Sequence, residues 1–276
     1  MIKILTLMDN LASENSNMRS HHGLSFHVET GGRTFLFDCG PDEDTIYNAH
    51  RLGVDLKHID FTICSHSHYD HASGYRDIVE NGFGGKTLYT GPGFWQRKYG
   101  WDGLKYTDIS AGFDDIFLRQ HDIEHKVCEG LLEIADDCWL VSDFPRVNEF
   151  ETISPRFVKG NPPDTVQDDF SDEVCLAAKT QKGLVVLVGC SHPGILNMIT
   201  RVHDVLDAPI YAVFGGTHLM HADEERISLT IDNLCKMGLS VIGLSHCSGE
   251  RAEKMLAADK RVRACHLASG NCIAIR

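Results

Sequence analysis

The stretch "SHSHYDHASG", residues 65–74, places three histidines and one aspartate within six positions, directly after the apolar segment "FTIC". Imidazole nitrogens and carboxylate oxygens are ligands for first-row divalent cations. From a loop at a strand end, His66 and His68 can converge on one ion. The adjacent side chains of Asp70 and His71 point in different directions and can reach a second ion. The run therefore predicts a site for two metal ions.

Strand-like and helix-like segments alternate along the chain, and the second half repeats the scheme of the first. Residues 24–30 and 33–40 are expected to be strands joined by a tight turn at Gly31-Gly32. Residues 131–143, "LLEIADDCWLVSD", are expected to form one strand. The order predicts an α/β fold of one domain, residues 1–276, with two sheets packed face to face and helices outside, an αββα sandwich of four layers.

Two long segments do not fit this scheme. Residues 91–116 are rich in aromatic residues and glycines, and residues 143–172 contain four of the eight prolines. Loops of this length are commonly lids or binding loops, so we expect both to cover the site. The alternative is that their aromatic side chains form small satellite cores.

Charge and cysteine content restrict the partners. The net charge of −13 comes with no basic run to offset it, which argues against nucleic acid and anionic membranes. Ten cysteines without a C-x-x-C pair favour free thiols and a cytoplasmic location. We expect no signal peptide and no membrane span. Bound cations reverse the field locally, so a small anionic substrate is expected. The oligomeric state stays open.

The chain resembles the metallo-β-lactamase-fold superfamily of binuclear metallohydrolases, whose signature H-x-H-x-D-H appears here as "HSHYDH". A finer likeness is to the subgroup named for 7,8-dihydropterin-6-methyl-4-(β-D-ribofuranosyl)aminobenzene-5'-phosphate synthase. Its landmarks appear in order as "HHGLSFHVE", "VGCSHPGILN", "FGGTHL" and "SHCSG". The likeness spans nearly the whole chain and implies a metallo-β-lactamase-like sandwich. It also implies a hydrolase or a dihydropterin synthase-like group-transfer enzyme, acting on a phosphorylated or pterin-like substrate through a metal-bound hydroxide.

The resemblance also implies roles for further residues. His246, in "LSHCSG", corresponds to the last metal ligand, and Asp38 lies behind the metal loop, where it would accept a hydrogen bond from a ligand imidazole. The third histidine of the usual pattern is carried over to His192. The usual bridging aspartate is replaced by Cys190, which is either a thiolate ligand or a buried cysteine without metal contact; we favour the second. Asp70 would bind metal and orient the nucleophile.

The expected cofactors are two divalent metal ions. The superfamily's diiron relatives carry a glutamate where this chain has His68, so a second imidazole favours zinc, with manganese or iron as alternatives.

Other candidates depend on their context. His218 follows a strand and a Gly-Gly turn, which suggests a catalytic or substrate-binding place at the site rim, with a structural role as the alternative. His22 is a weaker candidate. Arg146 is expected to hold a substrate phosphate, with Arg156 and Lys159 adding positive charge to the same segment.

Two other functions remain as alternatives. One is a non-catalytic metal-binding or redox-sensing module that uses the ten thiols. The other is a nuclease of the same fold, which the acidic charge disfavours.

Overall fold

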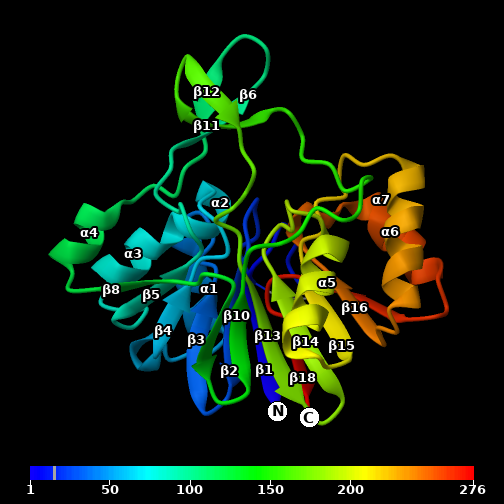
Figure 1. The fold of residues 1–276 in the computed structure, drawn as a ribbon. Helices are drawn as coiled ribbons and strands as arrows, with labels where there is room; N and C mark the ends of the chain where they lie inside the picture. The colour runs from blue at the N-terminus through cyan, green and yellow to red at the C-terminus, as the bar shows by residue number, and fades with distance from the viewer. Residues whose placement is uncertain (15–16) are drawn as a thin grey trace.

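The chain builds two seven-stranded sheets that pack face to face, with helices on both outer faces (Figure 1). The computed structural model describes residues 1–14 and 17–276. Three apolar clusters separate the layers: one between the sheets and one beneath each set of helices. This arrangement confirms the expected αββα sandwich. Within the described residues, no helix has both the length and the apolar character that a membrane span needs.

The first sheet contains most of the strands of the N-terminal half. Its spatial order is β18 (Cys272–Ile275), β1 (Ile2–Met8), β2 (Ser25–Thr30), β3 (Arg33–Phe37), β4 (Phe61–Ile63), β5 (Thr87–Thr90) and β8 (Glu124–Val127). The turn between β2 and β3 is the expected one, since Gly31 and Gly32 have φ angles of 56° and 70°. Such positive angles suit glycine because it has no Cβ.

The second sheet contains most of the strands of the C-terminal half. Its spatial order is β17 (Arg263–His266), β16 (Val241–Leu244), β15 (Ile210–Gly215), β14 (Gly183–Val188), β13 (Cys175–Thr180), β10 (Cys138–Val141) and β9 (Leu131–Ala135). The strands β14, β15, β16 and β17 are parallel, and the others pair antiparallel.

The central strand β14 shows why the sheets are covered on both faces. Its side chains alternate between the two faces. Val185 and Leu187 lie in the core between the sheets, whereas Leu184, Val186 and Val188 lie in the cluster under the helices. A strand that is apolar on both faces must be buried on both, which requires a layer on each side.

The helices close the two outer faces. Those over the first sheet are α1 (Asp44–Arg51), α3 (Gly74–Glu80) and α4 (Asp115–Gln120), and those over the second are α5 (Ile195–Leu206), α6 (Glu224–Lys236) and α7 (Glu250–Ala258). The short pieces are α2 (Tyr69–Ala72), η1 (Leu56–His58) and η2 (His246–Ser248).

The expectation of one strand over residues 131–143 is wrong. The segment is a hairpin of β9 and β10, in which Ala135 faces Cys138. Asp137 has a φ of 56°, a left-handed conformation that aspartate adopts more readily than most residues. The two turn-forming aspartates therefore interrupt a segment whose flanks are both strand-like.

The two long segments join each other in a third sheet, which projects from the top of the sandwich in Figure 1. This small sheet has the order β12 (Asp164–Gln167), β11 (Phe157–Asn161), β6 (Lys98–Trp101) and β7 (Tyr106–Asp108). Both segments were expected to be loops, but each contributes a hairpin, and β6 pairs antiparallel with β11. Their role as a lid remains a prediction.

Some aromatic residues of the first segment belong to the core. Phe94 is buried in the cluster under the helices of the first sheet, and Trp95 and Phe113 pack against that cluster. Trp101 and Tyr106 stack instead on the small sheet, with ring centroids 4.3 Å apart. The segment therefore combines a core anchor with a projecting hairpin.

Candidate metal centre

The histidine-rich loop lies where several parallel strands end. His66 and His68 follow β4, His192 follows β14, and His246 follows β16. Parallel neighbours within a sheet deliver their carboxyl ends to one edge, and functional groups of α/β proteins gather there. The fold thus brings together histidines that are up to 180 positions apart in the sequence.

The first group consists of His66, His68 and His192. Their potential ligand atoms lie within 4.8 Å of one another, and all three side chains are buried. Among the described residues, none of the three Nε2 atoms has a hydrogen-bond partner. Burial lowers the pKa of each ring well below its usual value, so the rings are neutral and each Nε2 can offer a lone pair. This donor set fits a divalent cation.

The second group consists of Asp70, His71 and His246, with His22 at its outer edge. Oδ2 of Asp70 lies 3.1 Å from Nε2 of His246 and 3.0 Å from Nε2 of His22. Nε2 of His71 lies 3.2 Å from Nε2 of His246 and 3.8 Å from Oδ2 of Asp70. Two imidazoles and a carboxylate that converge on one point also fit a divalent cation.

The carboxylates of the centre control its protonation. Burial raises the pKa of Asp70, but His71, His22 and His246 outweigh it and hold that pKa well below its usual range. Burial lowers the pKa of His71, yet the carboxylates of Asp38 and Asp70 raise it to about 9. A cation at Nε2 of His71 would therefore have to displace a proton.

Buried polar groups behind the rings fix their orientation. Oδ2 of Asp38 lies 2.7 Å from Nδ1 of His71. The same carboxylate accepts hydrogen bonds from the backbone N–H and the hydroxyl of Ser65, and that hydroxyl lies 3.0 Å from Nδ1 of His66. Oδ1 of Asn10 lies 2.8 Å from Nδ1 of His246. These contacts assign a proton to Nδ1 in all three rings, so that each Nε2 faces the centre.

Cys190 occupies the junction of the two groups. Its Sγ lies 3.1 Å from Nε2 of His71. Its sulfur can form one potential ligand cluster with His66 and His71, and a second with His246 and Cys247. A ligand at this position could reach both groups.

The backbone is left-handed at four residues of the centre. Asp38, Ser191, His218 and His246 have φ angles of 61°, 58°, 50° and 50°. This conformation is uncommon outside glycine and tends to persist at functional sites.

A pocket of about 160 Å³ opens onto both groups, and its lining includes His68, Asp70, Cys190, His192, His246 and, at the rim, His218. The ring of His218 lies 4.3 Å from that of His192. Burial, followed by the charge of Arg156, lowers the pKa of His218 to about 4, so its ring is neutral near pH 7.

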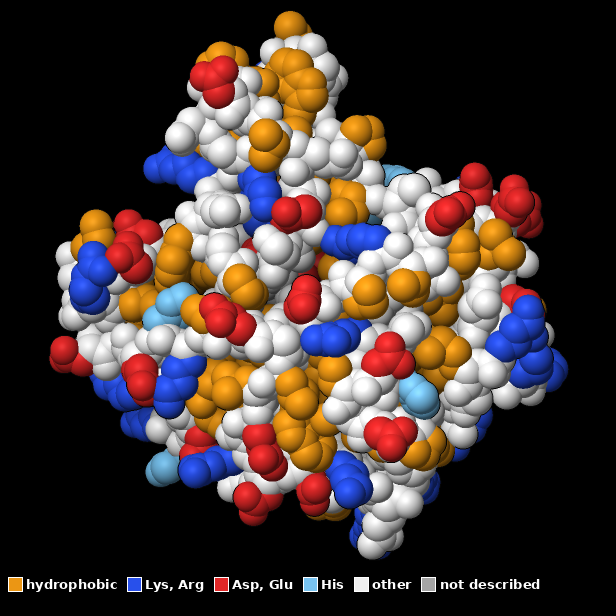
Figure 2. All heavy atoms as spheres, viewed as in Figure 1, with side chains coloured by type: hydrophobic (Ala, Val, Ile, Leu, Met, Phe, Trp, Pro, Cys, Tyr) orange, Lys and Arg blue, Asp and Glu red, His pale blue; other side chains and the backbone are white. Residues whose placement is uncertain are grey.

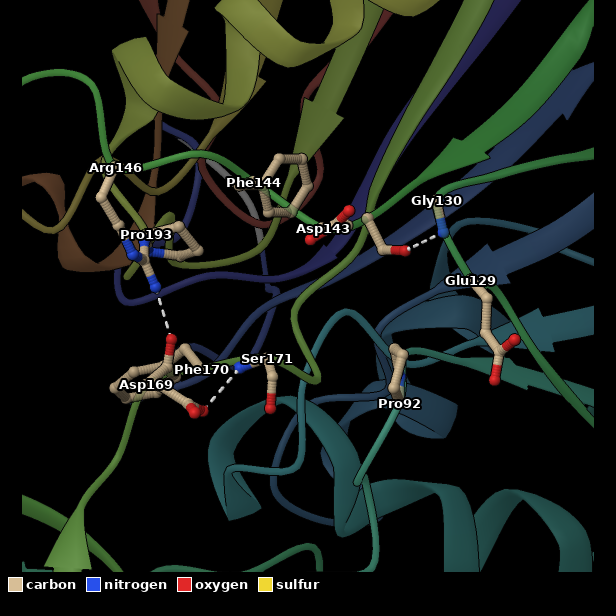
Figure 3. Close-up of a pocket in the computed structure, with 11 residues that line it drawn as sticks. Pro92, Glu129, Gly130, Asp143, Phe144, Arg146, Asp169, Phe170, Ser171 and Pro193 are labelled. Carbon is tan, nitrogen blue, oxygen red and sulfur yellow. Dashed lines mark hydrogen bonds between the residues drawn. The ribbon is translucent and has the colours of Figure 1, made fainter.

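Arg146 is not brought to this pocket. It lines a separate cavity of about 550 Å³, together with Phe144, Asp169 and Phe170 (Figure 3). There its guanidinium donates to the backbone carbonyl of Asp169. The structure instead brings Arg156 to the pocket beside the histidines. The expectation for Arg146 therefore receives no support from its position.

A buried ion-pair network was not anticipated. Nζ of Lys98, on β6 of the small sheet, lies 3.0 Å from Asp168 and 2.6 Å from Asp172. The other oxygen of Asp172 accepts hydrogen bonds from the backbone N–H and the hydroxyl of Ser67, between the two histidines of the metal loop. The small sheet is thus connected directly to that loop. In the sequence, Lys98 lies in an aromatic segment that looks like a loop, and nothing in that pattern indicates that its side chain is buried.

Asn10 was also missed. A signal for it was present, since Asp9 and Asn10 follow the apolar strand β1 directly, in the pattern that marks the other site residues. Backbone N–H of His246 donates to Asp9, and Asn10 contacts the His246 ring.

A four-layer sandwich with two candidate ligand groups at strand ends of both sheets is typical of a class of metal-binding proteins, and comparison with known families agrees. The model of the metallo-β-lactamase superfamily matches residues 20–170. The chain belongs to the metallo-β-lactamase superfamily.

Individual relatives extend the likeness to the full length. The 7,8-dihydropterin-6-methyl-4-(β-D-ribofuranosyl)-aminobenzene-5'-phosphate synthase of Methanocaldococcus jannaschii is 32% identical over 272 residues, which covers 92% of this chain and 90% of that protein. The crystal structure of Tm1679, a metal-dependent hydrolase of the β-lactamase superfamily, matches with a TM-score of 0.86 at 26% identity, over 100% of this chain and 99% of that one. A diphosphatase of the PhnP family shares the fold, with a TM-score of 0.58 at 11% identity, over 100% of this chain and 98% of that one.

Proposed function

We propose that this protein is a hydrolase or group-transfer enzyme that depends on two divalent cations and acts on a small anionic substrate, phosphorylated or pterin-like. The observation that carries the proposal is the convergence of the Nε2 atoms of His66, His68 and His192, buried and without hydrogen-bond partners in the described part of the chain. An unpaired buried polar atom costs about 1–3 kcal/mol. A cation bound to all three would remove that cost.

The ligand sets follow from the two groups. His66, His68 and His192 would hold the first cation, and Asp70, His71 and His246 the second. Zinc suits a centre rich in imidazole, with manganese or iron as alternatives. The position of Cys190 Sγ beside His71 supports a role as thiolate ligand, whereas the sequence alone favours a buried, non-ligating cysteine.

When bound, the divalent cations supply Lewis acidity and lower the pKa of water. The chain supplies the positioning. Asp38 fixes the His71 ring, and Asp70 orients the nucleophile from its place between His22 and His246. The neutral His218 ring, at the pocket rim, contacts the substrate.

The proposed substrate class also draws on the relatives. The M. jannaschii protein is named for a dihydropterin and a ribofuranosyl phosphate, and it aligns with nearly the whole of this chain. Hydrolysis and group transfer at such a centre differ in the acceptor, which is water in one case and a second substrate in the other. The ten free thiols support a cytoplasmic location.

Metal analysis joined to a substrate panel tests the proposal. We expect two equivalents of divalent metal per chain after metal-supplemented expression, and turnover of at least one member of a panel of phosphomonoesters, phosphodiesters, lactones and dihydropterins. His66→Ala should abolish both. Less than one equivalent of metal would contradict the proposal. Full metal with no turnover, together with tight binding of single-stranded RNA, would favour the nuclease alternative.

A further inference from the structure

The pocket over the two ligand groups contains one cationic side chain of the Lys or Arg type among its described lining residues. This is Arg156, the residue directly before β11 of the small sheet. The remaining wall consists of histidines, Asp70, cysteines and the apolar or aromatic residues Tyr69, Ile109, Phe157 and Met220. A guanidinium in this wall is a feature that a substrate could use.

Two contacts hold Arg156 in place. Its backbone carbonyl accepts a hydrogen bond of 2.7 Å from the N–H of Trp101, at the end of β6. Its guanidinium carbon lies 4.6 Å from the centroid of the Phe157 ring. Cation–π contact and stacking restrict the guanidinium without using its N–H donors.

The same Phe157 ring also lies close to three histidines of the pocket. Its centroid lies 5.4 Å from that of His68, 5.1 Å from that of His192 and 5.7 Å from that of His218. The Phe157 ring is therefore a shared neighbour of the guanidinium and of these imidazoles. A group bound at the centre is within reach of Arg156.

The donors of Arg156 are available. Within residues 1–14 and 17–276, its guanidinium makes no hydrogen bond or ion pair, whereas Arg97 pairs with Asp108 and Arg146 donates to the carbonyl of Asp169. Figure 2 shows Lys and Arg side chains, interspersed with Asp and Glu, where the projecting sheet meets the sandwich.

We propose that Arg156 binds a phosphate-type oxyanion of the substrate, next to the reacting centre. The planar guanidinium can donate two parallel hydrogen bonds to phosphate oxygens. The location of the reaction rests on the proposed function, but the binding of the oxyanion does not. The pocket of about 160 Å³ is large enough for a phosphate group. The rest of the substrate extends past the exposed Tyr69 and Met220.

Calorimetric titration of the protein as purified tests this assignment, with phenylphosphonate as the dianionic probe, benzoate as a monoanion and benzamide as a neutral analogue. Arg156→Gln should raise the Kd for phenylphosphonate about 10–100-fold, since charge-assisted hydrogen bonds are lost. Arg156→Lys should recover part of that loss, because it keeps the charge and loses the fork. The Kd for benzamide should not change.

The matched control is Arg97→Gln, on the same small sheet but outside the pocket, which should leave phenylphosphonate binding within about twofold, as expected for an exposed pair. An unchanged Kd for phenylphosphonate in Arg156→Gln would overturn the proposal. So would an equal loss for benzamide, or a larger loss for benzoate than for phenylphosphonate. Metal content is measured on the same samples. Absence of metal or of turnover would contradict the proposed function. The titration would still show whether phenylphosphonate binding depends on Arg156.

Discussion

The sulfur of Cys190 lies 3.1 Å from Nε2 of His71 and shares potential ligand clusters with members of both ligand groups. The pattern of the superfamily that the sequence resembles has an aspartate at this place, whereas this chain has a cysteine. Zinc and cobalt bind thiolates readily, so the exchange changes the donor type without removing a donor.

We therefore expect Cys190 to ligate metal. Cobalt-substituted protein should show an intense near-ultraviolet band from thiolate charge transfer, and Cys190→Ser should lose the band and bind both ions more weakly. Metal binding to the wild type should also release a thiol proton. Cys128→Ser, a change at a buried cysteine in the core between the sheets, serves as control. A cobalt spectrum without the band would favour the interpretation of Cys190 as a buried cysteine that does not bind metal.

Removing one imidazole of the first group should empty that site. His192→Ala leaves two imidazoles where three converge, so elemental analysis should find about one metal equivalent fewer per chain, and activity should be lost with it. His203→Ala, on the exposed face of α5, should keep full metal content. Retention of both metals in His192→Ala would mean that another residue completes the group.

Asp38→Asn tests the support of the His71 ring. The amide keeps the shape of the carboxylate but loses its charge, and changes of this kind typically lower metal affinity by about 10–100-fold. Competition with a chelator measures the change. Asp204→Asn, at an exposed carboxylate, should leave affinity unchanged. A loss of all metal would place Asp38 among the direct ligands instead.

Lys98→Met should destabilise the fold and weaken metal binding together. The change leaves Asp168 and Asp172 buried without their cation, which costs about 3–5 kcal/mol in comparable cases. It also loosens Asp172, which holds Ser67 of the metal loop. Urea unfolding and chelator competition report the two effects. The control Lys105→Met, at an exposed lysine, should match the wild type in stability and in metal affinity. If Lys98→Met changed neither quantity, the small sheet would be independent of the centre.

Stability should fall as the pH rises above neutrality because of His266. Burial lowers the pKa of this ring, but its contacts with Asp9, at 2.8 Å, and Glu253, at 3.0 Å, raise the pKa to about 10 in the folded state. The protonated His266 ring contributes its full stabilisation below about pH 6.5, which is the pKa of histidine in the unfolded chain. This contribution to the free energy of unfolding declines between about pH 6.5 and 10. The slope is at most about 1.4 kcal/mol per pH unit. His266→Gln should flatten the stability curve in that window, and an unchanged slope would contradict the assignment.

The layers and the metal loop could be predicted because their signals are local. The H-x-H-x-D-H run is contiguous, and the alternation in β14 encodes burial on both faces. The small sheet could not be predicted from such signals. Its strands have three to five residues each, mix polar and aromatic side chains, and depend on pairing between segments about 60 positions apart.

The same limit explains why Arg146 was preferred to Arg156. The two residues lie ten positions apart in a proline-rich segment, and both look equally suited to phosphate. Only the pairing of β11 with β6 turns Arg156 toward the histidines, while Arg146 remains on the sandwich side of the segment beside Asp169. Which of two similar side chains reaches a site is decided by tertiary contacts, and no local pattern records them.

The small sheet has a consequence for how new specificities could arise on this scaffold. Its two hairpin tips, around Gly103 and around residues 162–163, connect β6 to β7 and β11 to β12, and Leu104 at the first tip is exposed. Insertions, deletions or grafted sequences at these tips would alter the small sheet without touching a candidate metal ligand. Directed evolution could therefore concentrate its libraries on two short turns and keep the reactive machinery constant.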